Sequence, residues 1–271
     1  MTIESSRAIG RQPGVSWKSV KPRAIFLSFA LAAAAGVPVF AQSTDLPDAP
    51  QPAVTLSATP RNLLHDQVAI WTSPTKLRDS NAVGPILLVL ATTVAITTDH
   101  QAMTDVVTQN KTLNNHADTV SQGLVGGFIA APVAAFALGH LRHDDHAQET
   151  GILGGEAILD SLAVNEVVKI VSRRERPTLD SAHGKFFQSG VNFDSSFASN
   201  HAVIAWSSAA VIASEYPNLL TQVAAYGLAS GVSITRVVAR QHFPSDVVAA
   251  SAVGWMIGRY VVRRHRHHAV E

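Results

Sequence analysis

The residues best suited to chemistry in this chain fall in three short clusters, each next to an apolar stretch. In the first cluster, Lys169 and Arg176 lie seven residues apart and Pro177 follows. Seven residues are about two turns of helix, so a helix that continues to Arg176 would place both cations on one face. An ammonium group offers a point charge and a guanidinium group a bidentate fork. The first cluster therefore suits the binding of a phosphate dianion.

The second cluster, Ser199, Asn200 and His201, directly precedes an apolar stretch. If a helix begins here, its free backbone N–H groups and its positive dipole end form an anion site, to which Ser199 can add a hydroxyl. His201 would lie in the first turn, where it can exchange a proton with a leaving oxygen. This cluster predicts a second part of the same phosphate site.

The third cluster holds Arg236, His242 and Asp246, with Pro244 between the last two. Proline is common in the first turn of a helix, so His242 would stand at the start of a helix and Asp246 about one turn further along. A carboxylate at that position can accept the Nδ1 proton of His242 and leave Nε2 free to attack phosphorus. Arg236 would neutralise charge on the equatorial oxygens.

The elements that must position these clusters are predicted to be helices. Six apolar stretches show no strict period of two, and several are too long for ordinary strands. They span residues 83–98, 123–138, 151–171, 202–214, 219–235 and 247–262. We therefore expect an all-α fold, a helical bundle of about six core helices.

A short helix is also expected over residues 62–71, before the bundle. Its apolar residues Leu63, Leu64, Val68 and Trp71 can share one face. The segment is thus predicted to be a short amphipathic helix.

The ends of the chain predict four regions. Basic residues precede an apolar stretch at 24–40 and a small-residue exit at Ala41, a pattern typical of a secretory signal peptide. We assign residues 1–41 to this signal peptide and the proline-rich segment 42–61 to a linker. Residues 62–264 then form the domain, and residues 265–271 a histidine-rich tail.

The composition excludes several classes of protein. The formal net charge of +1 is unlike that of nucleic-acid-binding proteins, which carry a clear basic excess. The chain has no cysteine, so disulfides, thiolate metal sites and cysteine nucleophiles are excluded. With 46% hydrophobic and 15% charged residues, disorder across the whole chain is not expected.

Length and charge bear on whether the apolar stretches cross a membrane. Most are shorter than the roughly 20 apolar residues of a span. The third stretch contains Glu156, Asp160 and Glu166, and ionisable groups inside a span are costly. If the leader is cleaved, three spans would also leave the residues after 171 in the cytoplasm. We expect a soluble or peripheral protein of the periplasm or cell envelope, with an integral membrane protein as the alternative.

The three clusters together resemble the type 2 phosphatidate phosphatase and vanadium haloperoxidase superfamily. Its pattern is K-x6-R-P, then P-S-G-H, then S-R-x5-H-x3-D. The chain matches the first motif fully, has Ala198 and Asn200 in place of Pro and Gly in the second, and has Thr235 in place of Ser in the third. The resemblance covers residues 169–246 and implies the family's helical core. At the Gly position, Asn200 brings a side chain beside the expected phosphate.

The resemblance also implies a role for each matching residue. It makes His201 the general acid, His242 the nucleophile and Asp246 the carboxylate that orients His242. The implied phosphate-binding residues are Lys169, Arg176, Ser199, Asn200 and Arg236.

These roles imply an exported, metal-independent phosphatase that hydrolyses a phosphomonoester or a pyrophosphate, lipid-linked ones included, through a phospho-histidine. No cofactor is expected, and the partners are the phosphate substrate and a membrane surface rather than nucleic acid.

Two alternative functions remain open. One is a vanadium-dependent haloperoxidase, in which the pocket holds vanadate. The other is a non-catalytic envelope protein that retains the phosphate pocket, as the Ala198 and Asn200 departures would allow.

Two further groups of polar residues favour structural interpretations. His140, His143 and His146 lie close to Asp144 and Asp145 in the sequence, but a spacing of three residues scatters ligands around a helix, so a polar loop is favoured over a metal site. Arg173 and Arg174 are expected to be a solvated helix end.

Overall fold

The computed structural model describes residues 54–76, 79–190 and 194–265, and within these residues it contains seven α-helices and no strand. The predicted all-α fold is confirmed. The expected signal peptide lies outside the described residues. The helices are α2 Thr59–Thr72, α3 Asp79–Gln101, α4 Lys111–Arg142, α5 Asp145–Ser172, α6 Asn200–Glu215, α7 Leu219–Val238 and α8 Pro244–His265.

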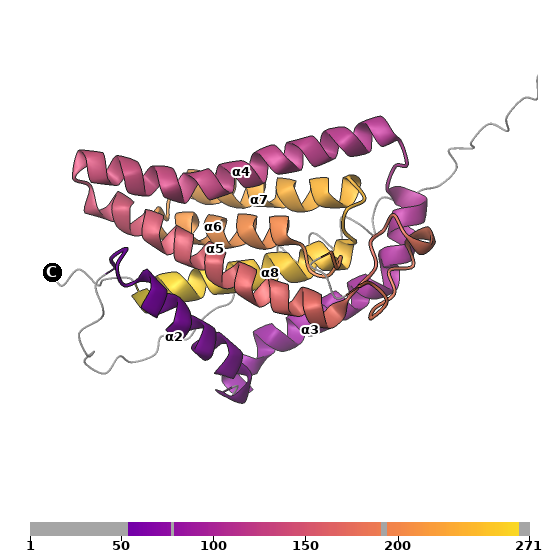
Figure 1. The fold of residues 1–271 in the computed structure, drawn as a ribbon, viewed down its shortest axis with the longest axis horizontal. Coiled ribbons are helices and arrows are strands. Elements are labelled where there is room, and N and C mark those ends of the chain that lie inside the picture. Colours follow the sequence, from indigo (N-terminus) through magenta and orange to yellow (C-terminus); the bar gives the residue numbers. More distant parts are fainter. Residues whose placement is uncertain (1–53, 77–78, 191–193, 266–271) are drawn as a thin grey trace, which may run out of the picture.

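Helix α6 lies at the centre of the bundle and contacts α4, α5, α7 and α8. Its residues are almost all apolar or small, which suits a helix surrounded by others. Figure 1 shows α4 along one side of the bundle with α7 beside it, and α3 and α2 on the opposite side. Each of the six predicted apolar stretches lies within one of the helices α3 to α8.

Glycines allow the closest contacts between helices. A Cβ atom at Gly254 of α8 would lie 2.5 Å from the carbonyl oxygen of Val203 in α6. At Gly151 of α5, a Cβ atom would lie 2.5 Å from the backbone nitrogen of Phe136 in α4. Any side chain would push these helices apart, so the positions of the helix ends depend on small residues here.

Helix direction alternates from α5 to α8, so four helix termini meet at one end of the bundle. Helices α5 and α7 end there, and α6 and α8 begin there (Figure 1). We call this the site end, because all three sequence clusters lie at these termini. Ser199 caps the N-terminus of α6 with its side chain, and Pro244 is the first residue of α8.

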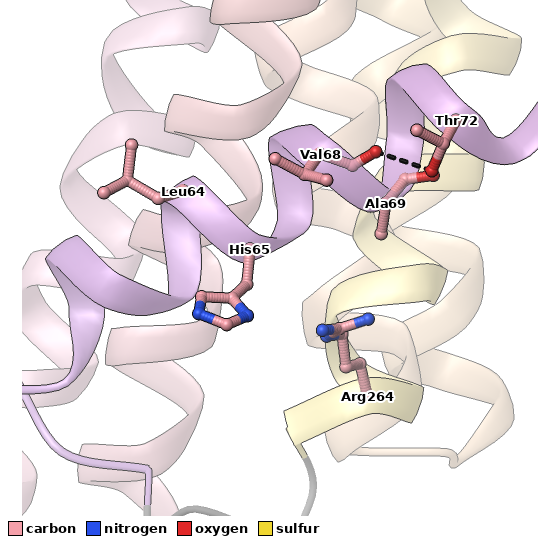
Figure 2. Close-up of a pocket in the computed structure, with 6 residues that line it drawn as sticks. All are labelled: Leu64, His65, Val68, Ala69, Thr72 and Arg264. Atoms are coloured by element: carbon pink, nitrogen blue, oxygen red, sulfur yellow. Dashed lines mark hydrogen bonds between the residues drawn. The ribbon is translucent and has the colours of Figure 1, made fainter.

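Helix α2 contains the short helix predicted for the segment 62–71, and it turns polar residues toward the bundle. Leu64 and Val68 are 71% and 65% exposed, whereas Asn62 and Asp66 are buried. Figure 2 shows the open hollow between α2 and the end of α8, with His65 and Ala69 on the side of α2 that lies toward Arg264. The predicted helix is present, and its apolar residues Leu64 and Val68 are exposed.

Helix α2 buries its polar residues because α5 and α8 present buried polar groups to it. Asn62 donates to Glu156 over 3.1 Å, and Gln67 donates to Asp160 over 2.7 Å. Asp66 lies 2.6 Å from Nε2 of His265, the last residue of α8. Buried carboxylates need polar partners, so α2 turns its polar face inward. His265, expected at the start of the tail, is thus buried in the bundle.

Among the described residues, two helical segments are long and apolar enough to cross a membrane, judged by length and composition: Val83–Val106 and Lys111–Arg142. Most of their apolar surface is exposed, as at Val89 (64%) and Val133 (66%). Exposed apolar surface of this extent is typical of a contact with lipid or with another protein. This observation is compatible with a membrane or envelope location.

Replacing Asp160 should change the stability of the protein in a pH-dependent way. Burial, with Asp66 and Glu156 nearby, raises the pKa of Asp160 to about 7, although the hydrogen bond from Gln67 lowers it. An unfolded Asp has a pKa of about 3.9, so wild-type stability should fall as the pH rises from about 4 to about 7.

An Asp160→Asn variant cannot ionise at this position, so its free energy of unfolding should exceed that of the wild type by more at about pH 8 than at about pH 5. Urea unfolding at both pH values measures this difference. Asp145→Asn, which removes an exposed carboxylate from the same helix, is the control. An equal effect of Asp160→Asn at both pH values would contradict the prediction.

Candidate active site

The site end brings five of the candidate side chains into one electrostatic neighbourhood. Besides burial, the positive charge of Arg176 lowers the pKa of Lys169. Besides burial, electrostatic repulsion from Arg236, His242 and Arg176 lowers the pKa of His201. Arg236 and Lys169 likewise add to the effect of burial in lowering the pKa of His242. Three cations thus lie around two histidines, although they come from positions up to 67 residues apart in the sequence (169 to 236). Such a concentration of positive charge is suited to an anion.

Lys169 lies in the last turn of α5 and is only 2% exposed. Its ammonium group donates to the carbonyl oxygen of Ser195 over 2.6 Å. Burial and the nearby Arg176 lower the pKa of Lys169 to about 8. The side chain therefore keeps its charge at neutral pH but is easier to deprotonate than an exposed lysine.

Arg176 is not on the helix that carries Lys169, contrary to the two-turn expectation. Helix α5 ends at Ser172, and Arg173 follows in the left-handed conformation with φ of 43°. The loop instead places Arg176 beside the third cluster, where its Nη1 donates to the carbonyl of Gln241 over 3.0 Å. Its Nε lies 2.9 Å from a carboxylate oxygen of Asp194.

Arg236 lies in the last turn of α7 and is held by a residue that the sequence did not indicate. Its Nη1 lies 2.6 Å from a carboxylate oxygen of Asp118 in α4. Its Nε is buried and has no hydrogen-bond partner within the described part of the chain. An unused buried donor at the site end can serve an incoming anion.

Ser199 and Asn200 form the start of α6, as predicted, but only Ser199 behaves as a simple cap. The Ser199 hydroxyl accepts from the backbone N–H of Ala202 over 3.4 Å. The Asn200 side chain turns toward α5, where it donates to Glu166 over 2.6 Å and accepts from Asn165. Asn200 therefore ties α6 to α5 through its side chain, and its predicted contact with a phosphate stays a prediction.

His242 is buried, and its Nδ1 lies 2.7 Å from the carbonyl oxygen of Ser196. A carbonyl can only accept, so Nδ1 carries the proton and Nε2 is the unprotonated nitrogen of the neutral ring. Burial is the main reason that the pKa of His242 falls to about 4, so the ring is neutral at neutral pH. These are the requirements for a nucleophilic imidazole.

Asp246 does not accept the Nδ1 proton directly, contrary to the expected geometry. Its nearest oxygen is 3.6 Å from Nδ1, beyond hydrogen-bond distance. The carboxylate instead accepts from the Ser196 hydroxyl and from Nη1 of Arg174, the latter over 2.6 Å. Ser196 therefore connects Asp246 to His242, because its hydroxyl donates to one and its carbonyl accepts from the other.

Arg174 is the functional candidate that sequence reasoning missed. It was expected to be a solvated helix end, but it is 1% exposed and pairs with Asp99 and Asp246. These partners are 75 and 72 residues away in the sequence. No local pattern could have indicated them.

The charge of Asp246 depends on this pair. Burial alone would raise the pKa of Asp246, but Arg174 and the contacts with His242 and Ser196 outweigh it and hold the pKa below its usual value. Asp246 is therefore ionised at neutral pH.

His201 lies in the first turn of α6, and its Nε2 is buried without a hydrogen-bond partner in the described residues. Burial, together with Arg236 and His242, lowers its pKa to about 4. In the absence of an anion, His201 is therefore neutral at neutral pH.

The histidines near the α4–α5 connection do not form a metal site in the described part of the chain. His146 pairs with Glu215 over 3.1 Å. In the described residues no group of three or more His, Cys, Asp or Glu side chains is placed to hold a metal ion. The hollow of Figure 2 contains none of the candidate residues.

A second, apolar hollow of about 250 Å³ lies between α3, α5 and α8. It reaches Phe197 and Ala198, which directly precede Ser199. An apolar group bound there would therefore lie close to the anion site.

Binding of a dianion should protonate His201. A dianion favours the imidazolium form and so raises the pKa of His201 from about 4, which means that protons are taken up at about pH 6. Sulfate is a suitable probe because it stays a dianion at this pH. Calorimetry of sulfate binding in two buffers of different ionisation enthalpy measures the uptake. His201→Gln should bind sulfate with less proton uptake, and an unchanged uptake would contradict the prediction.

One of the comparisons with known proteins matches the part of the chain that contains the candidate site. The family model of the PAP2 superfamily matches residues 151–268, a segment that contains all eight candidate site residues. No curated protein and no solved structure matches the chain significantly. Residues 151–268 of the chain thus match the PAP2 superfamily, which is the family that the three motifs resemble.

Proposed function

We propose that the protein is a phosphatase of the cell envelope that hydrolyses a phosphomonoester or a pyrophosphate through a phospho-histidine at His242. Members of the PAP2 superfamily are generally phosphatases, which supports the class of reaction. The observation that carries the proposal is the state of His242. Its Nδ1 is held by the Ser196 carbonyl and its Nε2 is unprotonated, in a neighbourhood of three cations.

In the first step, the phosphoryl group lies among Lys169, Arg176 and Arg236. Nε2 of His242 attacks phosphorus, and the bond from phosphorus to the leaving oxygen breaks as the bond to nitrogen forms. His201, protonated in the presence of the dianion, gives its proton to the leaving oxygen. The three cations neutralise charge on the equatorial oxygens throughout.

In the second step, a water molecule attacks the phospho-histidine. His201, now neutral, accepts a proton from this water while the bond between nitrogen and phosphorus breaks. Inorganic phosphate leaves, and His242 returns to the neutral state that the Ser196 carbonyl supports. Because the three cations supply the charge that a metal ion would supply, we expect the reaction to need no metal.

The structure supports a location at the envelope and leaves room for lipid-linked substrates. The exposed apolar surfaces of α3 and α4 suit contact with a membrane. The apolar hollow beside Phe197 and Ala198 suits an apolar portion of a substrate whose phosphate lies at the site end. Export by the expected signal peptide 1–41 completes the proposal.

The test is phosphate release by the purified protein from p-nitrophenyl phosphate and from a short-chain phosphatidate. Activity should persist in EDTA and be inhibited by vanadate. In His242→Ala it should fall by about a thousandfold or more, because the nucleophile is lost. His140→Ala, which removes an exposed histidine from α4, is the matched control and should keep full activity.

Three results would contradict the proposal. Activity that survives in His242→Ala would show that His242 is not the nucleophile. Halide oxidation in the presence of vanadate would identify a haloperoxidase. Tight binding of vanadate without turnover of any phosphate compound would identify a non-catalytic protein.

A further inference from the structure

The guanidinium group of Arg174 is the largest fully buried polar group in the described residues, and it lies between two carboxylates. Its Nη2 is 2.7 Å from Asp99 in α3, and its Nη1 is 2.6 Å from Asp246 in α8. The same Nη1 donates to the hydroxyl of Ser245 over 2.7 Å, and Nε donates to the carbonyl of Gly184 over 3.1 Å. All three guanidinium nitrogens thus donate hydrogen bonds to buried oxygens.

Aromatic rings complete the enclosure of this guanidinium. Its central carbon lies 4.1 Å from the ring centre of Phe243 and 4.8 Å from that of Phe186. Gly184 has a φ of 60°, and a Cβ atom there would come within 2.5 Å of Phe243 and 3.0 Å of Nη2 of Arg174. The enclosure therefore depends on a glycine, and it holds Arg174 in one position.

From Arg174, a series of contacts leads to the candidate nucleophile. One oxygen of Asp246 is held by Arg174, and the other accepts from the Ser196 hydroxyl and from the backbone N–H of Phe243. The carbonyl of Ser196 accepts from Nδ1 of His242. If Arg174 moved, Asp246 would lose its strongest partner, and the position of Ser196 would no longer be fixed.

We propose that Arg174 is a positioning residue for His242 and that Asp99 of α3 anchors it. This proposal rests on the proposed function of His242. Asp99 lies outside the matched segment 151–268. It follows that α3, together with its contact to Ser245 at the start of α8, completes the active site from a part of the chain that the family motifs do not include.

A purely structural role must be separated from positioning, because a buried pair also contributes to stability. Removing Arg174 alone leaves two buried carboxylates, Asp99 and Asp246, without their counter-charge, and this is strongly destabilising. Removing the charge of Asp99 as well relieves one of them. The double variant Arg174→Gln/Asp99→Asn should therefore recover stability but should not restore the contact that holds Asp246.

The experiment measures melting temperature, kcat and KM for Arg174→Gln and for the double variant, with kcat corrected for the folded fraction. We expect kcat to fall by about a hundredfold in both variants while KM changes little, because a displacement of about 1 Å at the nucleophile costs about this factor. The melting temperature should be higher in the double variant than in Arg174→Gln. Arg173→Gln, which removes a neighbouring guanidinium bound to the carbonyls of Ser189 and Phe187, is the control and should keep wild-type kcat.

The pH profile gives a second readout that a structural role would not change. The charged or titratable groups around Asp246 are Arg174, His242, Asp99 and Lys169. Without Arg174, the pKa of Asp246 should rise, because the cation that favours its ionised form is gone. The acid limb of the kcat/KM profile should then move to higher pH in Arg174→Gln, relative to Arg173→Gln.

A third readout does not depend on turnover. Nitrogen NMR of the His242 ring should show the proton on Nδ1 in the wild type and a mixture of tautomers in Arg174→Gln and in the double variant, with the signal identified by its loss in His242→Gln. If the wild type hydrolyses no phosphate compound, the proposed function fails, and this spectrum still decides on positioning. A wild-type tautomer in Arg174→Gln, or kcat that returns together with stability in the double variant, would overturn the proposal.

Discussion

Mutual repulsion among Lys169, Arg176 and Arg236 is the constraint on which the rest of the site depends. Like charges at the end of a bundle destabilise the fold unless oxygens compensate them. Each cation has such an oxygen, and each comes from a different part of the chain: the Ser195 carbonyl, the Gln241 carbonyl and the Asp118 carboxylate. The compensation is partial: burial is the main cause that lowers the pKa values of Lys169 and His201, and neighbouring positive charges lower them further. An anion at this position would complete it.

The helices meet this constraint through direction and close packing. Helices α6 and α8 begin at the site end, so their positive dipole ends point toward the candidate anion site. Helices α5 and α7 end there and carry Lys169 and Arg236 in their last turns. The small residues between α6 and α8 keep these termini close. In this way the fold places Lys169, Arg176 and Arg236 at one end of the bundle.

The sequence predicted the elements well and their long-range partners poorly. Apolar stretches located six of the helices, and the spacing within the motifs predicted the family, because both signals are local. The spacing of His242 and Asp246 suggested a direct bond, but Ser196 from another loop lies between them. Arg174 and the inward polar face of α2 were missed for the same reason. Their partners are many residues away, and no pattern along the chain records them.

The pairing of α2 with the end of α8 has a consequence for how the chain acquires its structure. Asp66 is fully buried, and its partners Tyr260, Arg264 and His265 belong to the last turns of the final helix, up to 199 residues later in the sequence. During synthesis, this carboxylate has no counterpart until the C-terminus leaves the ribosome. Helix α2 is made first among the described helices, and its environment is complete only when α8 has formed. The fold therefore joins its first and last described helices, and a nascent chain that stops before α8 leaves Asp66 without its buried partners although α5 is already present.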